Sequence, residues 1–228
     1  MQRVDANALV HVGATAKHLP RPPHEVDDVG VTEEVLIAPP VGTAAPMTHV
    51  RGTLIVTSLK ALDQRGHTSR YLAALSEENR TAIRAIIATT WVPEPLALAH
   101  YTACDALGLS SLEAQAIGAE VGARIRATFL GTLLGAARAA GTTPWTYFES
   151  LPRVFSRVSV GGAVAIYKLG PKEARAEWYG LRGLGVPYFR AAFRGANQAI
   201  LELFCTKAYV SETRALRGGD WAFRASWA

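Results

Sequence analysis

Few residues of this 228-residue chain have the types and spacing that catalysis or metal binding requires. Its two cysteines, Cys104 and Cys205, stand far apart and form neither a Cys-x-x-Cys pair nor a Cys/His ligand spacing, which argues against a disulfide framework and a structural zinc site. No serine lies in a Gly-x-Ser-x-Gly turn. The glycines of Gly161-Gly162 and Gly183-Leu-Gly185 lack the lysine and the spacing that hold a nucleotide phosphate. We therefore expect no enzyme, no metal site and no cofactor.

The six histidines form no cluster in the sequence. Only His100 lies in a segment with helical periodicity. The other five are His11, His18, His24, His49 and His67. A single histidine on a helix is more often structural than a ligand, so we expect a structural role for His100.

Large apolar residues gather in the second half of the chain, and several have glycine neighbours. We predict that they converge between a sheet and a layer of helices and line a mostly apolar cavity of roughly a few hundred Å³. The predicted ligand-binding residues are Phe129, Leu133, Tyr147, Phe148, Trp178, Phe189, Phe193, Trp221 and Phe223. The alternative is that these side chains fill the core at normal density.

Composition and charge indicate a soluble chain in a reducing cytoplasm. The most apolar helical run, from Ala127 to Ala137, is too short to span a bilayer, and charged residues interrupt the N-terminal segment. The formal net charge is +5, and residues 151–228 hold twelve Lys and Arg against five Asp and Glu. These arginines are scattered through predicted strands, which favours a solvated sheet face over a nucleic-acid surface.

Residues 1–48 are predicted to form an extended or flexible arm. They contain six of the twelve prolines, which block helix propagation and sheet pairing, and an acidic patch from Glu25 to Glu34. A short strand is expected at Val35 to Ala38. The patch could dock on the basic last third of this chain or on a partner protein, and the alternative is a flexible tail.

Five helical segments follow from Val50 onward. They cover about residues 50–66, 69–75, 77–87, 95–107 and 112–140, with Ser76 and Ser110 as N-caps. The longest contains Gly118-x-x-x-Gly122 and Gly131-x-x-x-Gly135, although glycine costs about 1 kcal/mol relative to alanine inside a helix. Close helix packing is the interpretation that we favour over a ligand groove.

The last third of the chain shows the clearest pattern. Trp221, Phe223 and Trp227 alternate with polar residues after a turn at 217–220, which predicts a C-terminal hairpin. An amphipathic helix precedes it at 187–204, and two strands are predicted at 163–169 and 172–181. The predicted fold class is α+β, with a helical layer on a four-stranded antiparallel sheet, and the predicted domains are 1–48 and 49–228.

This arrangement, with Trp91-Val92-Pro93 ahead of the fourth helix, resembles a myxobacterial family of unknown function. It is more distantly similar to the 4-vinyl reductase domain, the heme nitric-oxide binding domain and the small TRAPP subunits. The run Gly219-Asp220-Trp221-Ala222-Phe223 resembles the Gly-Asp-x-Cys-x-Phe end of 4-vinyl reductase domains without its cysteine. The resemblance implies a helical layer over a four-stranded sheet and an apolar ligand between the layers. It also implies that Cys104 carries an acyl chain. The alternative is that Cys104 is a buried, unreactive thiol.

The resemblance to heme sensors is weaker at the residues that would hold heme. Such domains use an axial histidine and a Tyr-x-Ser-x-Arg motif, whereas this chain has Tyr209-Val-Ser211-Glu-Thr213, with Arg214 one position late. We therefore rank a heme-based gas sensor with His100 as the axial ligand below two other functions. The first is a non-catalytic sensory or binding module for a small apolar ligand or acyl chain in bacterial signalling. The second is an interaction scaffold without ligand. In either case we expect a homodimer formed through helices, because the Gly-x-x-x-Gly helix and the aromatic segment from Trp145 to Phe155 offer more apolar surface than one small sheet can cover.

Overall fold

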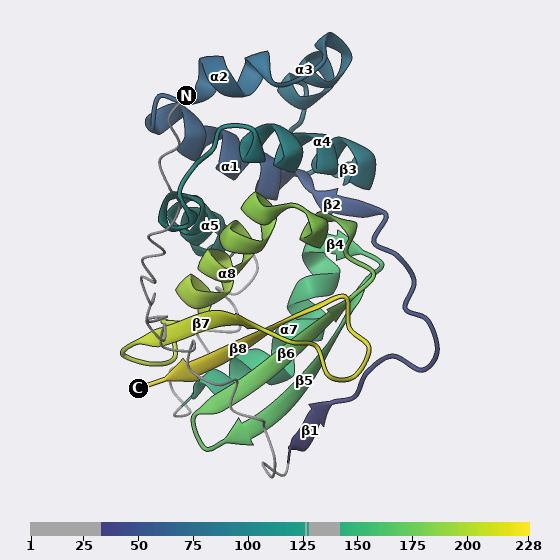
Figure 1. The fold of residues 1–228 in the computed structure, drawn as a ribbon, viewed down its shortest axis with the longest axis vertical. Helices are drawn as coiled ribbons and strands as arrows, with labels where there is room; N and C mark the ends of the chain where they lie inside the picture. The colour runs from purple at the N-terminus through teal and green to yellow at the C-terminus, as the bar shows by residue number, and fades with distance from the viewer. Residues whose placement is uncertain (1–32, 126, 128–141) are drawn as a thin grey trace, which may run out of the picture. The chain divides into compact units, whose positions relative to one another are not determined.

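The main sheet has five antiparallel strands in the order β1-β5-β6-β8-β7. The strands are β1 (Glu34–Ile37), β5 (Ala163–Gly170), β6 (Glu173–Tyr179), β7 (Ala208–Thr213) and β8 (Trp221–Trp227). Both predicted hairpins and the short strand near residue 35 are confirmed. The prediction of four strands is wrong, because β1 pairs with β5 and adds a fifth strand at the edge of the sheet (Figure 1).

The computed structural model describes residues 33–125, 127 and 142–228. Within the part of the chain from Thr32 to Ala228, which forms one compact unit, a second sheet has the order β3-β2-β4. Its strands are β2 (His49–Arg51), β3 (Trp91–Pro93) and β4 (Ser159–Val160). The sequence pattern indicated only an interruption at residues 91–93, whereas Val92 lies opposite Val50 in this small sheet.

Seven α-helices and a 3₁₀ turn are described. They are α1 (Gly52–Gln64), α2 (Thr68–Ala73), α3 (Glu77–Arg84), α4 (Glu94–Asp105), α5 (Ser111–Ile125), α7 (Pro144–Val158), η2 (Arg182–Gly185) and α8 (Pro187–Leu201). The Ser76 hydroxyl accepts from the Asn79 amide, and Ser110 with Glu113 forms a reciprocal cap at the start of α5. Among the described helices, none combines the length and the apolar character that a membrane crossing needs.

Helices α5 and α8 approach each other at glycines. A Cβ atom on Gly118 would lie 1.8 Å from the carbonyl oxygen of Ala192, and one on Gly195 would lie 2.0 Å from that of Gln115. Contacts this close leave no room for a side chain, which is why glycine is present despite its cost within a helix. Close helix packing is therefore the role of Gly118 and Gly122; Gly131 and Gly135 lie outside the described residues.

One face of the main sheet is covered by helices, and the opposite face is covered in part. Trp178 and Phe223 point toward the helices and are 1% and 0% exposed. On the opposite face, Arg175 and Glu177 are 2% and 0% exposed, so the expectation of a solvated sheet face is wrong for this strand. The sequence pattern places side chains on alternate faces but does not tell what lies over each face.

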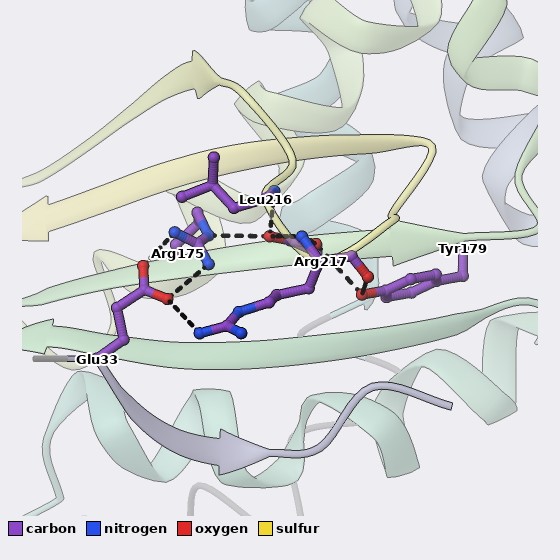
Figure 2. A network of polar contacts seen from close by, with 6 residues as sticks. Glu33, Arg175, Tyr179, Leu216 and Arg217 are labelled. Carbon is purple, nitrogen blue, oxygen red and sulfur yellow. Dashed lines mark hydrogen bonds and ion pairs between the residues drawn. The ribbon is translucent and has the colours of Figure 1, made fainter. Parts of the chain in front are cut away.

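A buried ionic network holds the chain segments on this second face together (Figure 2). The Arg175 guanidinium donates to both carboxylate oxygens of Glu33, and its Nε lies 3.1 Å from Oε1 of Glu177. Glu177 in turn accepts from the backbone amides of Leu216 and Arg217, at 2.7 and 3.0 Å. The network thus joins the residue that precedes β1, strand β6 and the turn before β8.

Candidate functional site

A cavity of about 110 Å³ lies between the helices and the main sheet. Helices α1, α4, α5, α7 and α8 contribute to its walls, and Trp178 of β6 contributes the side toward the sheet. Trp178 packs against Phe155 and Phe193, with ring centroids 5.1 and 4.7 Å apart. These aromatic rings fill much of the space between the two layers.

Four of the predicted ligand-binding residues line this cavity: Tyr147, Trp178, Phe189 and Phe193. Three others do not. Phe148 packs against Trp145 and Trp227, Phe223 packs beside Trp178 on the neighbouring strand, and the Trp221 indole donates to Glu212 at 3.3 Å. Phe129 and Leu133 lie outside the described residues. Whether any of these residues binds a ligand stays a prediction.

Polar groups that the sequence did not indicate also line the cavity. The Tyr147 hydroxyl donates to Oδ1 of Asn197 at 2.7 Å, and the Tyr188 hydroxyl lies 3.3 Å from the Ser58 hydroxyl. Tyr101 packs on Phe189, with ring centroids 4.5 Å apart. Burial raises the pKa of Tyr101, Tyr147 and Tyr188 above the usual range, so all three are neutral phenols.

His100 is fully buried beside the cavity but does not line it. Its Nδ1 lies 2.8 Å from the Tyr71 hydroxyl, and its Nε2 lies 3.1 Å from the Ser58 hydroxyl. The Cys104 sulfur, one helical turn away, is 3.7 Å from Nε2. Burial lowers the pKa of His100 to about 3 and raises the pKa of Cys104 to about 12. The pair is therefore a neutral thiol beside a neutral imidazole, which is a structural arrangement and not an activated nucleophile.

This burial predicts a stability change with pH. The folded-state pKa of His100 lies below its ordinary value of 6.5, so the unfolded chain binds the extra proton and stability falls as the pH drops below about 6.5. Between about pH 7.5 and about pH 5, His100 should cost the wild type about 2 kcal/mol of unfolding free energy. Urea unfolding at both values measures this loss.

The loss should shrink in His100→Gln and persist in the control His67→Gln, because His67 lies at the surface between α1 and α2. An equal loss in wild type and His100→Gln would contradict the assignment.

Comparison with known proteins shows the fold. No protein-family model and no curated protein matches the sequence. The chain is similar to the solved structure of an Fe(II) unliganded H-NOX protein from K. algicida and to that of its mutant, each with a TM-score of 0.57 and 9% identity over 78% of this chain and 96% of that one. A third structure, from work on modulating heme redox potential through porphyrin distortion, has a TM-score of 0.50 and 13% identity over 78% of this chain and 99% of its own. The described unit therefore has an H-NOX-like fold, in agreement with the distant resemblance to heme nitric-oxide binding domains.

These comparisons correct the predicted order of functions. The reported neighbours are H-NOX proteins and none is described as binding an acyl chain, so the prediction of a module for a small apolar ligand or acyl chain is wrong, and the heme-based gas sensor that we placed behind it is the better supported of the two.

The described residues, however, do not fit a heme. Within residues 33–125, 127 and 142–228, no histidine, cysteine, lysine or arginine lines the cavity, and its volume of about 110 Å³ is below the roughly 300–1,000 Å³ of ligand pockets. Both ring nitrogens of His100 already have partners. Tyr209 and Ser211, which stand where the propionate motif was sought, are exposed on the edge strand β7. Among the described residues that line the cavity, the Met47 thioether and the tyrosine hydroxyls are groups of a kind that can ligate heme iron, and burial disfavours the phenolate form of the tyrosines.

Proposed function

We propose that this chain is a sensory domain of the H-NOX type, with heme-based gas sensing as the function to test first. The observation that supports it is the fold likeness, which extends over 96% of the K. algicida H-NOX protein. That protein is described in an Fe(II) unliganded state, and the third neighbour comes from work on heme redox potential. A sensory role also agrees with an interior in which buried, neutral side chains offer no activated nucleophile among the described residues.

A hemin titration of the purified full chain tests this function. Heme-based sensing predicts a Soret band that saturates at one hemin per chain and, after reduction, shifts on addition of CO or NO. Because His100 does not line the cavity, His100→Gln should leave such a band unchanged. Hemin that never saturates at one equivalent, with the spectrum of nonspecifically bound hemin, would overturn heme-based sensing.

A second candidate is favoured by the cavity itself: a signalling domain that keeps the H-NOX architecture and works without heme. Trp178, Phe155 and Phe193 occupy the space between the layers, and the described residues that line the cavity include neither a histidine nor a cysteine. A failed titration together with a folded, cooperatively unfolding protein supports this candidate. A stoichiometric Soret band overturns it.

Three further expectations remain predictions: membership in the myxobacterial family, a cytoplasmic location and the absence of turnover. The predicted homodimer has lost part of its structural basis. Gly118 and Gly122 contact α8 of the same chain, and Tyr147 and Phe148 of α7 are 2% and 0% exposed, so these residues are not free to form an interface between chains.

A further inference from the structure

A second concave site lies away from the interlayer cavity, between helices α3 and α4 and the 3₁₀ turn η2 (α3 and α4 are labelled in Figure 1). This groove has a volume of about 460 Å³. Leu75, Pro95 and Leu98 give it an apolar wall, and Ser76 and Asn79 stand at the start of α3. It therefore has room for a small organic molecule.

The groove contains a buried carboxylate that lacks hydrogen-bond donors. The Glu94 side chain is 6% exposed, and its Oε1 has no hydrogen-bond partner among the described residues. Its Oε2 lies 3.6 Å from Nη1 of Arg182, which is beyond hydrogen-bond distance. Burying a carboxylate without donors is costly, so the fold leaves this group unsatisfied.

Two observations argue that Glu94 is not simply half of a structural ion pair. The Arg182 side chain is 69% exposed and therefore solvated, so it can move away from the Glu94 carboxylate at little cost in free energy. Glu94 is also the first residue of α4, where the helix dipole stabilises a negative charge, but among the described residues no hydrogen bond from the helix reaches its Oε1. The fold therefore holds the Glu94 carboxylate in a concave, partly apolar site.

We propose that this groove binds an organic cation, an ammonium or guanidinium group carried on a short apolar chain. The cation pairs with Glu94 in place of Arg182, and the chain lies along Leu75, Pro95 and Leu98. Charge-assisted hydrogen bonds to the carboxylate give the site its selectivity for a cation. The proposal is independent of whether the interlayer cavity holds heme.

Calorimetric titration of the full-length protein with hexylamine, hexylguanidine and hexanol tests the site. We expect one site per chain for the two cations and at least about tenfold weaker binding of hexanol, which has the same chain without the charge. Glu94→Gln keeps the shape and should weaken cation binding by about tenfold or more. Arg182→Ala removes the competing cation and should leave binding equal or tighter. The matched control Glu78→Gln, an exposed acid in the first turn of α3, should change nothing.

A stability measurement separates a binding residue from a structural one. If Glu94 serves a ligand, Glu94→Gln without ligand should unfold at the same or a higher urea concentration than wild type, because the substitution removes a buried, unsatisfied charge. A parallel titration with a short lysine-containing peptide tells whether the cation is a free amine or a protein side chain. Tighter binding of the peptide than of hexylamine assigns the site to a partner protein. Equal affinity for hexylamine and hexanol, or undiminished hexylamine binding by Glu94→Gln, would overturn the proposal.

Discussion

Replacing Gly118 by alanine should lower the free energy of unfolding by at least about 3 kcal/mol. On helix propensity alone the change would stabilise α5 by about 1 kcal/mol, so the sign is set by the contact with α8. The new Cβ would lie 1.8 Å from the Ala192 carbonyl oxygen, and backbone atoms cannot move aside as a flexible side chain can. The two helices must separate and lose their packing, which urea unfolding followed by circular dichroism will register.

Two further glycines make this prediction specific. Gly195→Ala should destabilise to a similar degree, because its Cβ would lie 2.0 Å from the Gln115 carbonyl oxygen on the other helix of the pair. Gly185→Ala is the matched control: nothing lies within 4 Å of its Cβ position, so its effect should stay within about 0.5 kcal/mol. Equal stability of the Gly118 and Gly185 variants would mean that α5 and α8 are not in close contact.

Replacing Arg175 by methionine should cost about 3–5 kcal/mol, the usual effect of removing one partner from a buried ion pair. Methionine keeps much of the side-chain volume but leaves Glu33 and Glu177 facing each other without the cation between them. The carboxylate of Glu177 is 0% exposed and cannot recover its hydration. Urea unfolding of the variant at neutral pH measures the effect.

Two further variants test the effect of Arg175→Met: a second substitution that should restore stability, and a control at an exposed ion pair. Adding Glu177→Gln to Arg175→Met should recover part of the lost stability, since it removes one of the two carboxylate charges that have lost Arg175. Glu173→Gln removes one partner of Arg224, whose side chain is 51% exposed, and should cost less than about 1 kcal/mol. A loss below about 1 kcal/mol in Arg175→Met would show that the network on the second face of the sheet is solvated.

The elements that could be predicted from the sequence are those with local periodicity. The alternation from Trp221 to Trp227 predicted β8, and the apolar stripe after Pro187 predicted α8, because both patterns depend only on neighbouring residues. Strand β1 was expected as an isolated short strand, but its partner in the sheet was not, since pairing with β5 joins positions far apart in the chain. Burial of Arg175 was missed for the same reason: its cover comes from Glu33 and the turn at Leu216.

The candidate site was predicted only in part. The periodicity of the sequence and the type of a residue indicate on which face of a helix or strand its side chain lies, but not what that side chain contacts in the folded protein. Trp178 and Phe193 line the cavity, whereas Phe223, on the same face of the sheet, packs beside Trp178 and is not part of the cavity lining. Tyr188 and Asn197 were missed, since polar residues within an apolar stripe resemble surface positions. The four-residue spacing of His100 and Cys104 on one helix was a signal that would have placed the two side chains in contact.

The pairing of early and late segments also has a kinetic consequence. Glu33 is hydrogen-bonded to a residue 142 positions later, and Thr48 to one 112 positions later, so both sheets are complete only when the chain has formed a loop that contains α1 to α5 and α7. Those helices can form from local contacts within microseconds, but closing so large a loop is entropically costly and delays the long-range strand pairing. Until β5 has formed, β1 has no strand to pair with, and although β2 can pair with β3, it cannot pair with β4. The arginine and glutamate side chains that later form the buried network remain hydrated until then. We therefore expect the slow step of folding to be the docking of β1 and Glu33 onto strands encoded more than one hundred positions further along the chain.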